Sequence, residues 1–149
     1  MTSYSSIAVG TDGTDTAEVA VRRAAGIARD AGAKLTIISA WHGQNRALLD
    51  PPTADTSVPV MGQRNAEEYA EAARAIAEEE GATDVETYTV RNPAANALID
   101  AVDEKNIELI VIGSQGVHSL AGRLFGSVAM EVLRHSPVDV MVVNTDAVK

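Results

Sequence analysis

Residues 109–127 read LIVIGSQGVHSLAGRLFGS: an apolar run, then a loop with four of the chain's eleven glycines, then an expected helix start. The run Leu109–Ile112 is wholly apolar, which favours a central strand of a parallel sheet. Glycine lets the main chain approach a ligand closely, and a helix N-terminus carries partial positive charge. The stretch therefore predicts an α/β fold with a phosphate-binding loop, and we take a nucleotide site as the working hypothesis.

The rest of the chain alternates apolar runs of strand length with alanine-rich segments of helical period. This alternation predicts right-handed βαβ units and an open five-stranded parallel sheet with helices on both faces. Ligands of such sheets bind outside the carboxyl ends of the strands, where strand order reverses. The loops after the first, second and fourth strands should therefore form one crevice. We expect strands at 6–10, 34–40, 85–90, 109–112 and 138–143, and helices at 16–31, 61–80, 94–105 and 128–135.

Length and composition suit one soluble domain, 1–149, with a core of aliphatic side chains. The chain has 149 residues, of which 46% are hydrophobic and 3% aromatic. Its net charge of −9 disfavours nucleic acid or an anionic membrane as a partner, because both need a positive surface. The absence of cysteine excludes disulfides and thiolate metal sites, and no cluster has metal-ligand spacing. Without a signal peptide or an apolar run of about 20 residues, a cytoplasmic location is expected.

One segment interrupts the alternation of strand and helix patterns. Residues 41–59 contain Pro51, Pro52 and Pro59 and show no sustained periodicity. A connection of this length in a small domain is usually a lid, a binding loop or a mobile excursion. Trp41, the only tryptophan, stands at its start and could cover a bound base, although ordinary core packing is favoured.

The glycine spacing and both ends of the chain resemble the universal stress protein family, in its ATP-binding branch, over essentially the full length. The resemblance implies a sheet like that of the adenine nucleotide alpha hydrolases, with strand order 3-2-1-4-5. It rests on three segments: Gly113 with Gly116 and Gly126-Ser127, VGTDGT at 9–14, and SPVDV at 136–140.

The resemblance also implies which residues bind an adenine nucleotide. Asp12 would lie at the adenine or ribose end of the cleft, and the main chain of Ala40 would meet the adenine. Ser127 would donate its hydroxyl to a phosphate at the start of a helix. The full expected set is Gly10, Thr11, Asp12, Ala40, Gly113, Gly116, Arg123, Gly126, Ser127 and Val128.

Some of these residues have alternative roles. Arg91 stands where many relatives have a glycine, so it could add a cation near the phosphates or narrow the cleft. The number of phosphates that the site prefers is therefore open. Without the family resemblance, each feature has an explanation that involves no ligand. The glycines could form tight turns, Asp12 could cap the first helix or stabilise a turn, and Arg123 could lie in solvent.

The loop lacks the lysine that a dedicated ATPase or kinase places on its phosphates. Gly126-Ser127 is followed by Val128, and no lysine lies in the loop. We therefore expect a nucleotide-binding regulator without a catalytic residue, and the family resemblance implies a role in a stress response. ATP, AMP and cyclic AMP are candidate ligands, and Mg²⁺ would enter only with a polyphosphate. The alternatives are slow ATP hydrolysis and an interaction protein with a vestigial site.

The last expected strand, Val138–Val143, is apolar and would lie at the edge of the sheet. An exposed edge of that kind needs a partner or a cover. The resemblance implies that two copies pair along this strand as an antiparallel homodimer.

Overall fold

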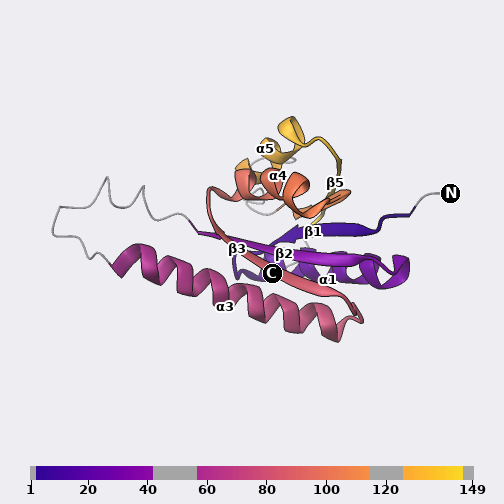
Figure 1. Ribbon diagram of the computed structural model, residues 1–149, viewed down its shortest axis with the longest axis horizontal. Helices are drawn as coiled ribbons and strands as arrows, with labels where there is room; N and C mark the ends of the chain where they lie inside the picture. Colours follow the sequence, from indigo (N-terminus) through magenta and orange to yellow (C-terminus); the bar gives the residue numbers. More distant parts are fainter. Residues whose placement is uncertain (1–2, 42–56, 115–125, 146–149) are drawn as a thin grey trace.

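The computed structural model describes residues 3–41, 57–114 and 126–145. Within them, five strands form one parallel sheet in the order β3-β2-β1-β4-β5, which confirms the expected fold class and strand order (Figure 1). Strand order reverses between β1 and β4, because the chain proceeds from β1 toward one edge and returns to the other. The strands are β1 (Ser6–Gly10), β2 (Lys34–Trp41), β3 (Val85–Arg91), β4 (Leu109–Gly113) and β5 (Asp139–Val143).

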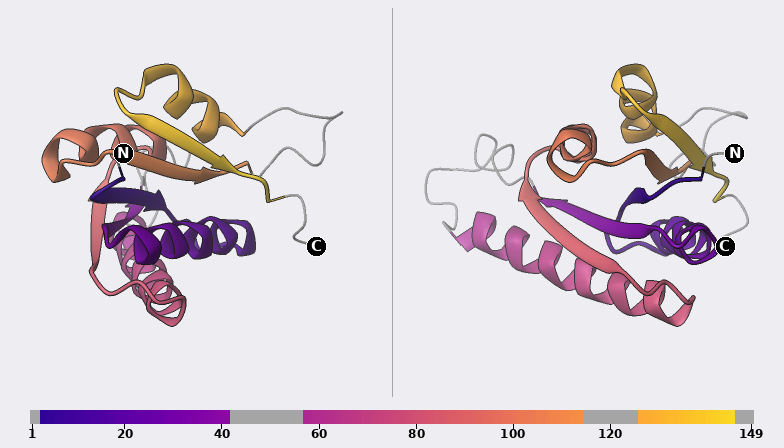
Figure 2. Two further views of the ribbon diagram at one scale, coloured as in Figure 1. Left: turned by 90° about the vertical axis from the view of Figure 1, so that its right-hand side faces the viewer. Right: turned by 45° about the vertical axis from the view of Figure 1, so that its right-hand side comes forward.

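Helices cover both faces of the sheet. α1 (Asp15–Ala31) and α3 (Ser57–Glu79) lie on one face, and α4 (Ala94–Lys105) and α5 (Ser127–His135) lie on the other (Figure 2). Successive side chains of a strand point to opposite faces, so the central strand β1 serves both layers. Ile7 and Val9 are fully buried on the α1–α3 side, and Ala8 on the α4–α5 side.

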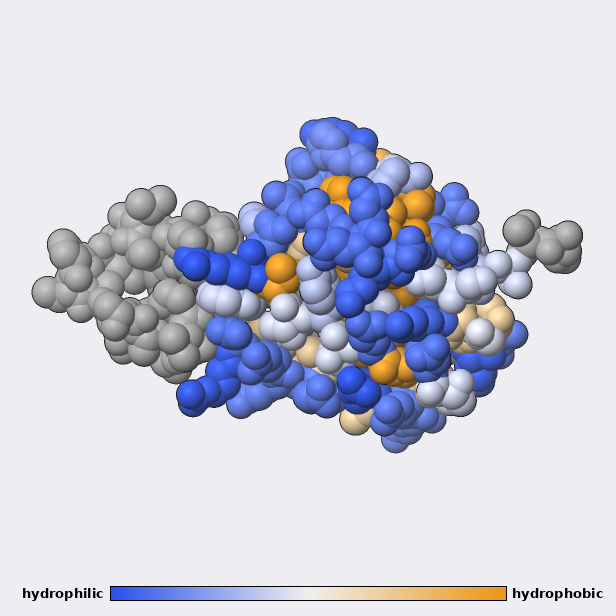
Figure 3. All heavy atoms as spheres, in the orientation of Figure 1, coloured by the Kyte–Doolittle hydropathy of each residue, from blue (hydrophilic) through white to orange (hydrophobic). Residues whose placement is uncertain are grey.

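The helices approach the sheet closely because their inner faces are mostly alanine. Ala20, Ala24 and Ala28 of α1 are almost fully buried, as are Ala73 and Ala77 of α3. Side chains this short let a helix backbone lie near the strands without leaving voids. The outer surface is mostly hydrophilic in the view of Figure 3, with apolar side chains showing among polar ones over the α4–α5 layer.

The boundaries of the expected irregular segment are wrong at both ends. β2 continues through Trp41, and Ser57–Pro59 already belong to α3. A proline is tolerated in the first turn of a helix, because the backbone N–H groups there have no intrahelical acceptor. The remainder of the segment, 42–56, lies outside the described residues.

Other boundaries differ from the expected ranges by one residue: α1 and α5 begin one residue earlier, α3 ends one residue earlier, and β4 ends one residue later. The ranges of β3 and β5 differ as well. β3 runs one residue further, to Arg91, which pairs with Trp41. β5 begins at Asp139 rather than Val138, because the Ser136 hydroxyl holds Val138 in a turn. The hydroxyl donates to the Val138 carbonyl at 2.8 Å and accepts from the Val138 N–H at 3.1 Å.

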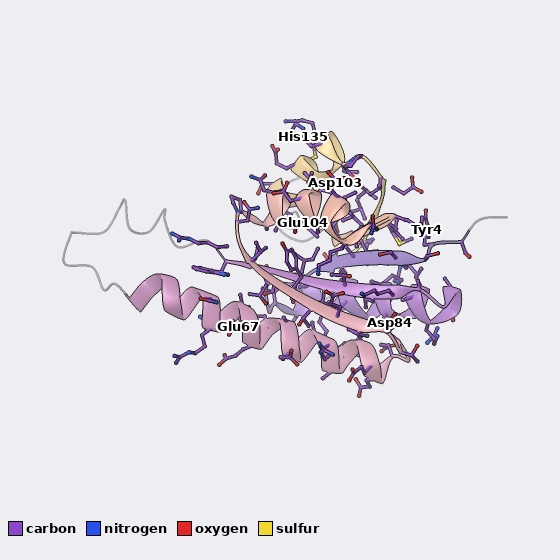
Figure 4. The ribbon with its side chains drawn as sticks, in the orientation of Figure 1. Tyr4, Glu67, Asp84, Asp103, Glu104 and His135 are labelled. Atoms are coloured by element: carbon purple, nitrogen blue, oxygen red, sulfur yellow. The ribbon has the colours of Figure 1, made fainter. Side chains whose placement is uncertain are left out.

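Charged side chains protect the edge strand β3. The Glu86 carboxylate accepts hydrogen bonds from Lys105 of α4 and from Lys34 of β2, both at 2.7 Å. These two ammonium groups, Lys105 foremost, hold the pKa of Glu86 below its usual range. Beside them Tyr88 donates to Glu104 of α4, the residue labelled in Figure 4. Inward-pointing charges on an edge strand discourage pairing with another chain.

We predict that Glu86→Gln destabilises the protein by about 0.5–1 kcal/mol near pH 7, as expected for partly exposed ion pairs. The pKa of Glu86 is lower in the folded state than in the unfolded state, so the ion pairs stabilise the protein above the unfolded value. That stabilisation is lost as the pH falls through the folded value. Urea unfolding of both proteins should show a difference that shrinks below about pH 4.

Glu68→Gln is the matched control, because Glu68 is exposed on α3 and forms no ion pair with the described residues. This control should leave the free energy of unfolding unchanged at every pH. A Glu86→Gln difference that persists at low pH would contradict the role of the carboxylate charge.

Candidate functional site

A pocket opens at the carboxyl ends of the strands, on both sides of the reversal between β1 and β4. Six residues of the expected set line it: Gly10, Thr11, Asp12, Ala40, Gly113 and Val128. They come from four places in the sequence, so only the parallel pairing of the strands brings them together. Tyr4, whose phenol donates to Asp139 at 2.7 Å, lies at the opposite, amino ends of the strands (Figure 4).

The pocket has other walls that the sequence did not single out. Their side chains are apolar except for one threonine, and they lie inside elements whose periodicity indicates only burial. No local signal distinguishes a pocket-lining alanine from a core alanine. These residues are Thr16, Ala17 and Ala20 of α1, Ile38 of β2, Ala94 and Leu98 of α4, and Ile112 of β4.

The loop after β1 is a hydrogen-bonded turn that carries Asp12. The Thr11 N–H donates to the Ile38 carbonyl at 3.0 Å, which ties the loop to β2. Asp12 Oδ1 accepts from the Thr14 N–H at 3.0 Å and from the Thr14 hydroxyl at 2.6 Å. Oδ2 accepts no hydrogen bond from the described residues, so it is available to a ligand.

Asp12 is not the residue that caps α1. Thr14 is the N-cap, and its Oγ1 accepts from the Ala17 N–H at 3.2 Å. Asp12 accepts a hydrogen bond from the Thr14 hydroxyl. Asp12 therefore supports the capping residue but does not cap the helix itself. A role in the turn and a contact with a ligand through the other oxygen are compatible.

Gly113, where β4 ends, lies against a buried polar link. A Cβ at Gly113 would lie 3.1 Å from Cγ2 of Thr145. Thr145 cannot easily move, because its N–H donates to Ser114 Oγ at 3.2 Å and both residues are buried. The Ser114 N–H donates to the Val143 carbonyl at 3.0 Å. These contacts hold the base of the glycine loop against the chain that follows β5.

The start of α5 forms another wall. Val128 lines the pocket from the first turn of the helix, where backbone N–H groups lack intrahelical acceptors. Gly126 is the N-cap, with φ −63° and ψ 164°, and no side chain caps the helix. Gly126 is half-buried and Ser127 is exposed, and neither is among the described lining residues. Gly116 and Arg123 lie outside the described residues.

Trp41 and Arg91 stack on each other at the carboxyl ends of β2 and β3. The Arg91 guanidinium carbon lies 5.4 Å from the centroid of the Trp41 ring. Trp41 is half-buried and borders Gly62 of α3, so its side chain lies on the other face of β2 from that of Ala40. Neither Trp41 nor Arg91 is among the described lining residues, and contact of Arg91 with a phosphate stays a prediction.

The described lining of the pocket carries one charged side chain, that of Asp12. The remaining walls are apolar or backbone, with two threonine hydroxyls. Among the described residues no group of three His, Cys, Asp or Glu side chains could hold a metal ion. In the same part of the chain, no helix is long and apolar enough to cross a bilayer. The site therefore offers an apolar slot, one carboxylate and a helix start.

Comparison with known proteins gives consistent matches over nearly the whole chain. The model of the universal stress protein family matches residues 3–144. Universal stress protein Rv1636 of Mycobacterium tuberculosis is 39% identical over 146 residues, which cover 97% of this chain and 99% of that protein.

Two similar solved structures contain a nucleotide. A universal stress protein in complex with cAMP is 33% identical, with a TM-score of 0.75, over 97% of this chain and 100% of that one. The universal stress protein of Archaeoglobus fulgidus in complex with dAMP is 25% identical, with a TM-score of 0.69, over 95% and 98% of the two chains.

We predict that Gly113→Ala destabilises the protein by about 1–2 kcal/mol, because the new methyl group overpacks against Thr145. Thr145→Ser keeps the hydroxyl that bonds to Ser114 and removes the methyl group. In that background Gly113→Ala should cost less than about 0.5 kcal/mol, so the two changes should be coupled. Urea unfolding of the four proteins measures the coupling.

Gly10→Ala is the control for adding a methyl group at a strand end. Its Cβ would lie 3.6 Å from the Leu98 methyl carbons, an ordinary contact. It should therefore cost less than Gly113→Ala. Equal losses for Gly113→Ala in the wild-type and Thr145→Ser backgrounds would show that the Thr145 methyl group is not the reason for glycine.

Proposed function

Because the chain belongs to the universal stress protein family, we propose that it is a regulatory module that binds an adenine nucleotide at the carboxyl ends of β1, β2 and β4. One observation carries the proposal: Asp12, Ala40, Gly113 and Val128 converge on one pocket from distant places in the sequence. The similar structures that hold cAMP and dAMP support the same class of ligand.

The pocket has complementary chemistry for the three parts of a nucleotide. Ile38 and Leu98 offer apolar surface against which a flat base can pack. Oδ2 of Asp12 would accept a hydrogen bond from a ribose hydroxyl or an amino group. The first turn of α5, beside Val128, would receive the phosphate, because helix N-termini bind anions.

Within the class of adenine nucleotides, the charge of the pocket favours a ligand with one phosphate. Among the described lining residues the only charge is the negative one of Asp12, so no described cation offsets a triphosphate. The cAMP and dAMP complexes of similar proteins both hold monophosphates. Cyclic AMP and AMP are therefore the ligands that we place ahead of ATP.

The module would act by holding a nucleotide rather than by converting it. The described pocket presents one carboxylate and no lysine or histidine. Phosphoryl transfer needs a cation that neutralises the transferred phosphoryl group, and a base that positions the attacking group. A bound nucleotide would instead favour the conformation or assembly that binds it better.

We propose that the assembly is a homodimer formed along β5. β5 lies at one edge of the sheet, and Val140 and Val142 are half-buried there. The opposite edge, β3, carries the ion pairs of Glu86 and is less suited to pairing. Beyond Asp139 at its start, β5 is apolar, and an apolar edge strand needs a partner or a cover.

The first test identifies the ligand. Purified protein is denatured and any released nucleotide is identified, and the stripped protein is then titrated with cAMP, AMP and ATP by calorimetry. We expect saturable binding of one nucleotide per chain, with cAMP or AMP at least about tenfold tighter than ATP. Trp41 is a second readout, because it follows Ala40 of the pocket. Failure of all three nucleotides to bind would overturn the proposed function.

Replacing Gly126 tests where the phosphate lies. The backbone angles of Gly126 suit any residue, so a ligand that approaches closely is a reason for glycine there. Gly126→Leu should weaken nucleotide binding at least about tenfold while the fold, followed by circular dichroism, stays intact. Gly26→Leu is the control, because an added Cβ there meets only the Arg29 guanidinium. Unchanged affinity in Gly126→Leu would place the phosphate elsewhere.

Light scattering tests the assembly. The wild-type chain should have the mass of a dimer at micromolar concentration. Val140→Lys should shift it to the monomer, because a charge on β5 would be buried between the copies. Thr87→Lys, on the opposite edge strand β3, should leave the dimer intact. A monomeric wild-type protein would contradict the proposed pairing.

A further inference from the structure

We propose that Tyr69 of α3 is a positioning residue for the pocket: its ring braces the turn 11–14 and thereby holds the Asp12 carboxylate in place. The inference rests on the proposed function and adds α3 to the elements that build the site. Tyr69 does not line the pocket and would not touch the nucleotide.

Gly13 is the point of contact between the turn and the ring. A Cβ at Gly13 would lie 2.5 Å from Cδ1, 2.6 Å from Cε1 and 2.9 Å from Cγ of Tyr69, so the Gly13 backbone lies directly against the ring. These atoms belong to the body of the ring, which cannot move aside as the tip of a long side chain can. Gly13 also has φ +82°, a conformation that side chains with a Cβ rarely adopt.

The brace itself is anchored to the sheet. One helical turn before Tyr69, the Ala66 carbonyl accepts a hydrogen bond of 2.7 Å from the buried hydroxyl of Ser39 on β2. Ala70 and Ala73 of α3 are also buried against the core. Tyr69 therefore extends from a fixed helix face, and Ser39 directly precedes Ala40 of the pocket.

Moving the turn would move Asp12. Gly13 follows Asp12 directly, and its N–H donates to the Thr11 hydroxyl at 3.2 Å. Asp12 Oδ1 is bonded to both the N–H and the hydroxyl of Thr14 on the other side of Gly13. The carboxylate can therefore keep its position only while Gly13 keeps its own.

Ring contact rather than hydrogen bonding makes Tyr69 a brace. The residue is 39% exposed, so ordinary core packing does not explain an aromatic side chain here. The phenol hydroxyl has no hydrogen-bond partner among the described residues. Phenylalanine should therefore replace tyrosine without loss, whereas alanine should release the turn.

Nucleotide titration of Tyr69 variants tests the role. Tyr69→Ala should weaken binding of cAMP, AMP or ATP, whichever binds wild type most tightly, at least about fivefold. Tyr69→Phe should bind like wild type. Glu68→Ala, the exposed neighbour on α3, is the control for changes in helix stability. Wild-type affinity in Tyr69→Ala would overturn the proposal, as would equal losses in the alanine and phenylalanine variants.

A double-mutant cycle with Asp12→Asn shows whether Tyr69 acts through the carboxylate. If it does, Tyr69→Ala should weaken binding much less in the Asp12→Asn background than in wild type. A general loss of folding stability would instead weaken binding equally in both backgrounds. Equal losses would therefore overturn the positioning role.

A measurement on the ligand-free protein tests the role of Tyr69 independently of nucleotide binding. Order parameters of the Gly13 and Thr14 amides should fall in Tyr69→Ala, from the value of about 0.85 typical of rigid backbone, and should remain there in Tyr69→Phe. Unchanged order parameters in Tyr69→Ala would overturn the brace even if nucleotides bind. If the turn loosens but wild type binds no nucleotide, the brace stands and the proposed function fails.

Discussion

The parallel pairing of β1 with both β2 and β4 is the constraint on which the rest of the structure depends. Val9 of β1 pairs with Ile37 on one side and with Val111 on the other. Because the chain leaves β1 toward one face and β4 toward the other, the two connections separate at the carboxyl ends of the strands. A crevice at that point is a consequence of strand order, before any side chain is considered.

Small residues turn this crevice into a pocket with room for a ligand. Gly10 and Gly113 end the two central strands, and alanines of α1 and α4 face them. The same choice serves packing, because the Thr145 methyl group lies against Gly113. The same small residues therefore allow close approach of the backbones and leave room for a ligand. The buried link from Ser114 to Thr145 is an example of the close packing.

The lining of the pocket suits the proposed ligand, a nucleoside phosphate. Its lining includes the Asp12 carboxylate, which accepts hydrogen bonds, and Val128 in the first turn of α5, where an anion is favoured. Apolar side chains such as Leu98 lie among the walls. If Tyr69 braces the turn that carries Asp12, the recognition of a ligand depends on α3 as well, although α3 does not line the pocket. Binding would then be coupled to the α1–α3 layer.

Local patterns in the sequence determined the five strands, their burial and the candidates at the loops, because hydrophobic period and turn chemistry act over a few residues. Strand order and the expected roles of Gly116, Gly126 and Ser127 came from family resemblance instead. Other features depend on contacts between residues far apart in the chain. Ile38 and Leu98 meet in the pocket, Trp41 stacks with Arg91, and Tyr69 lies against Gly13. Each partner alone has an ordinary local pattern, so only tertiary packing could decide these contacts.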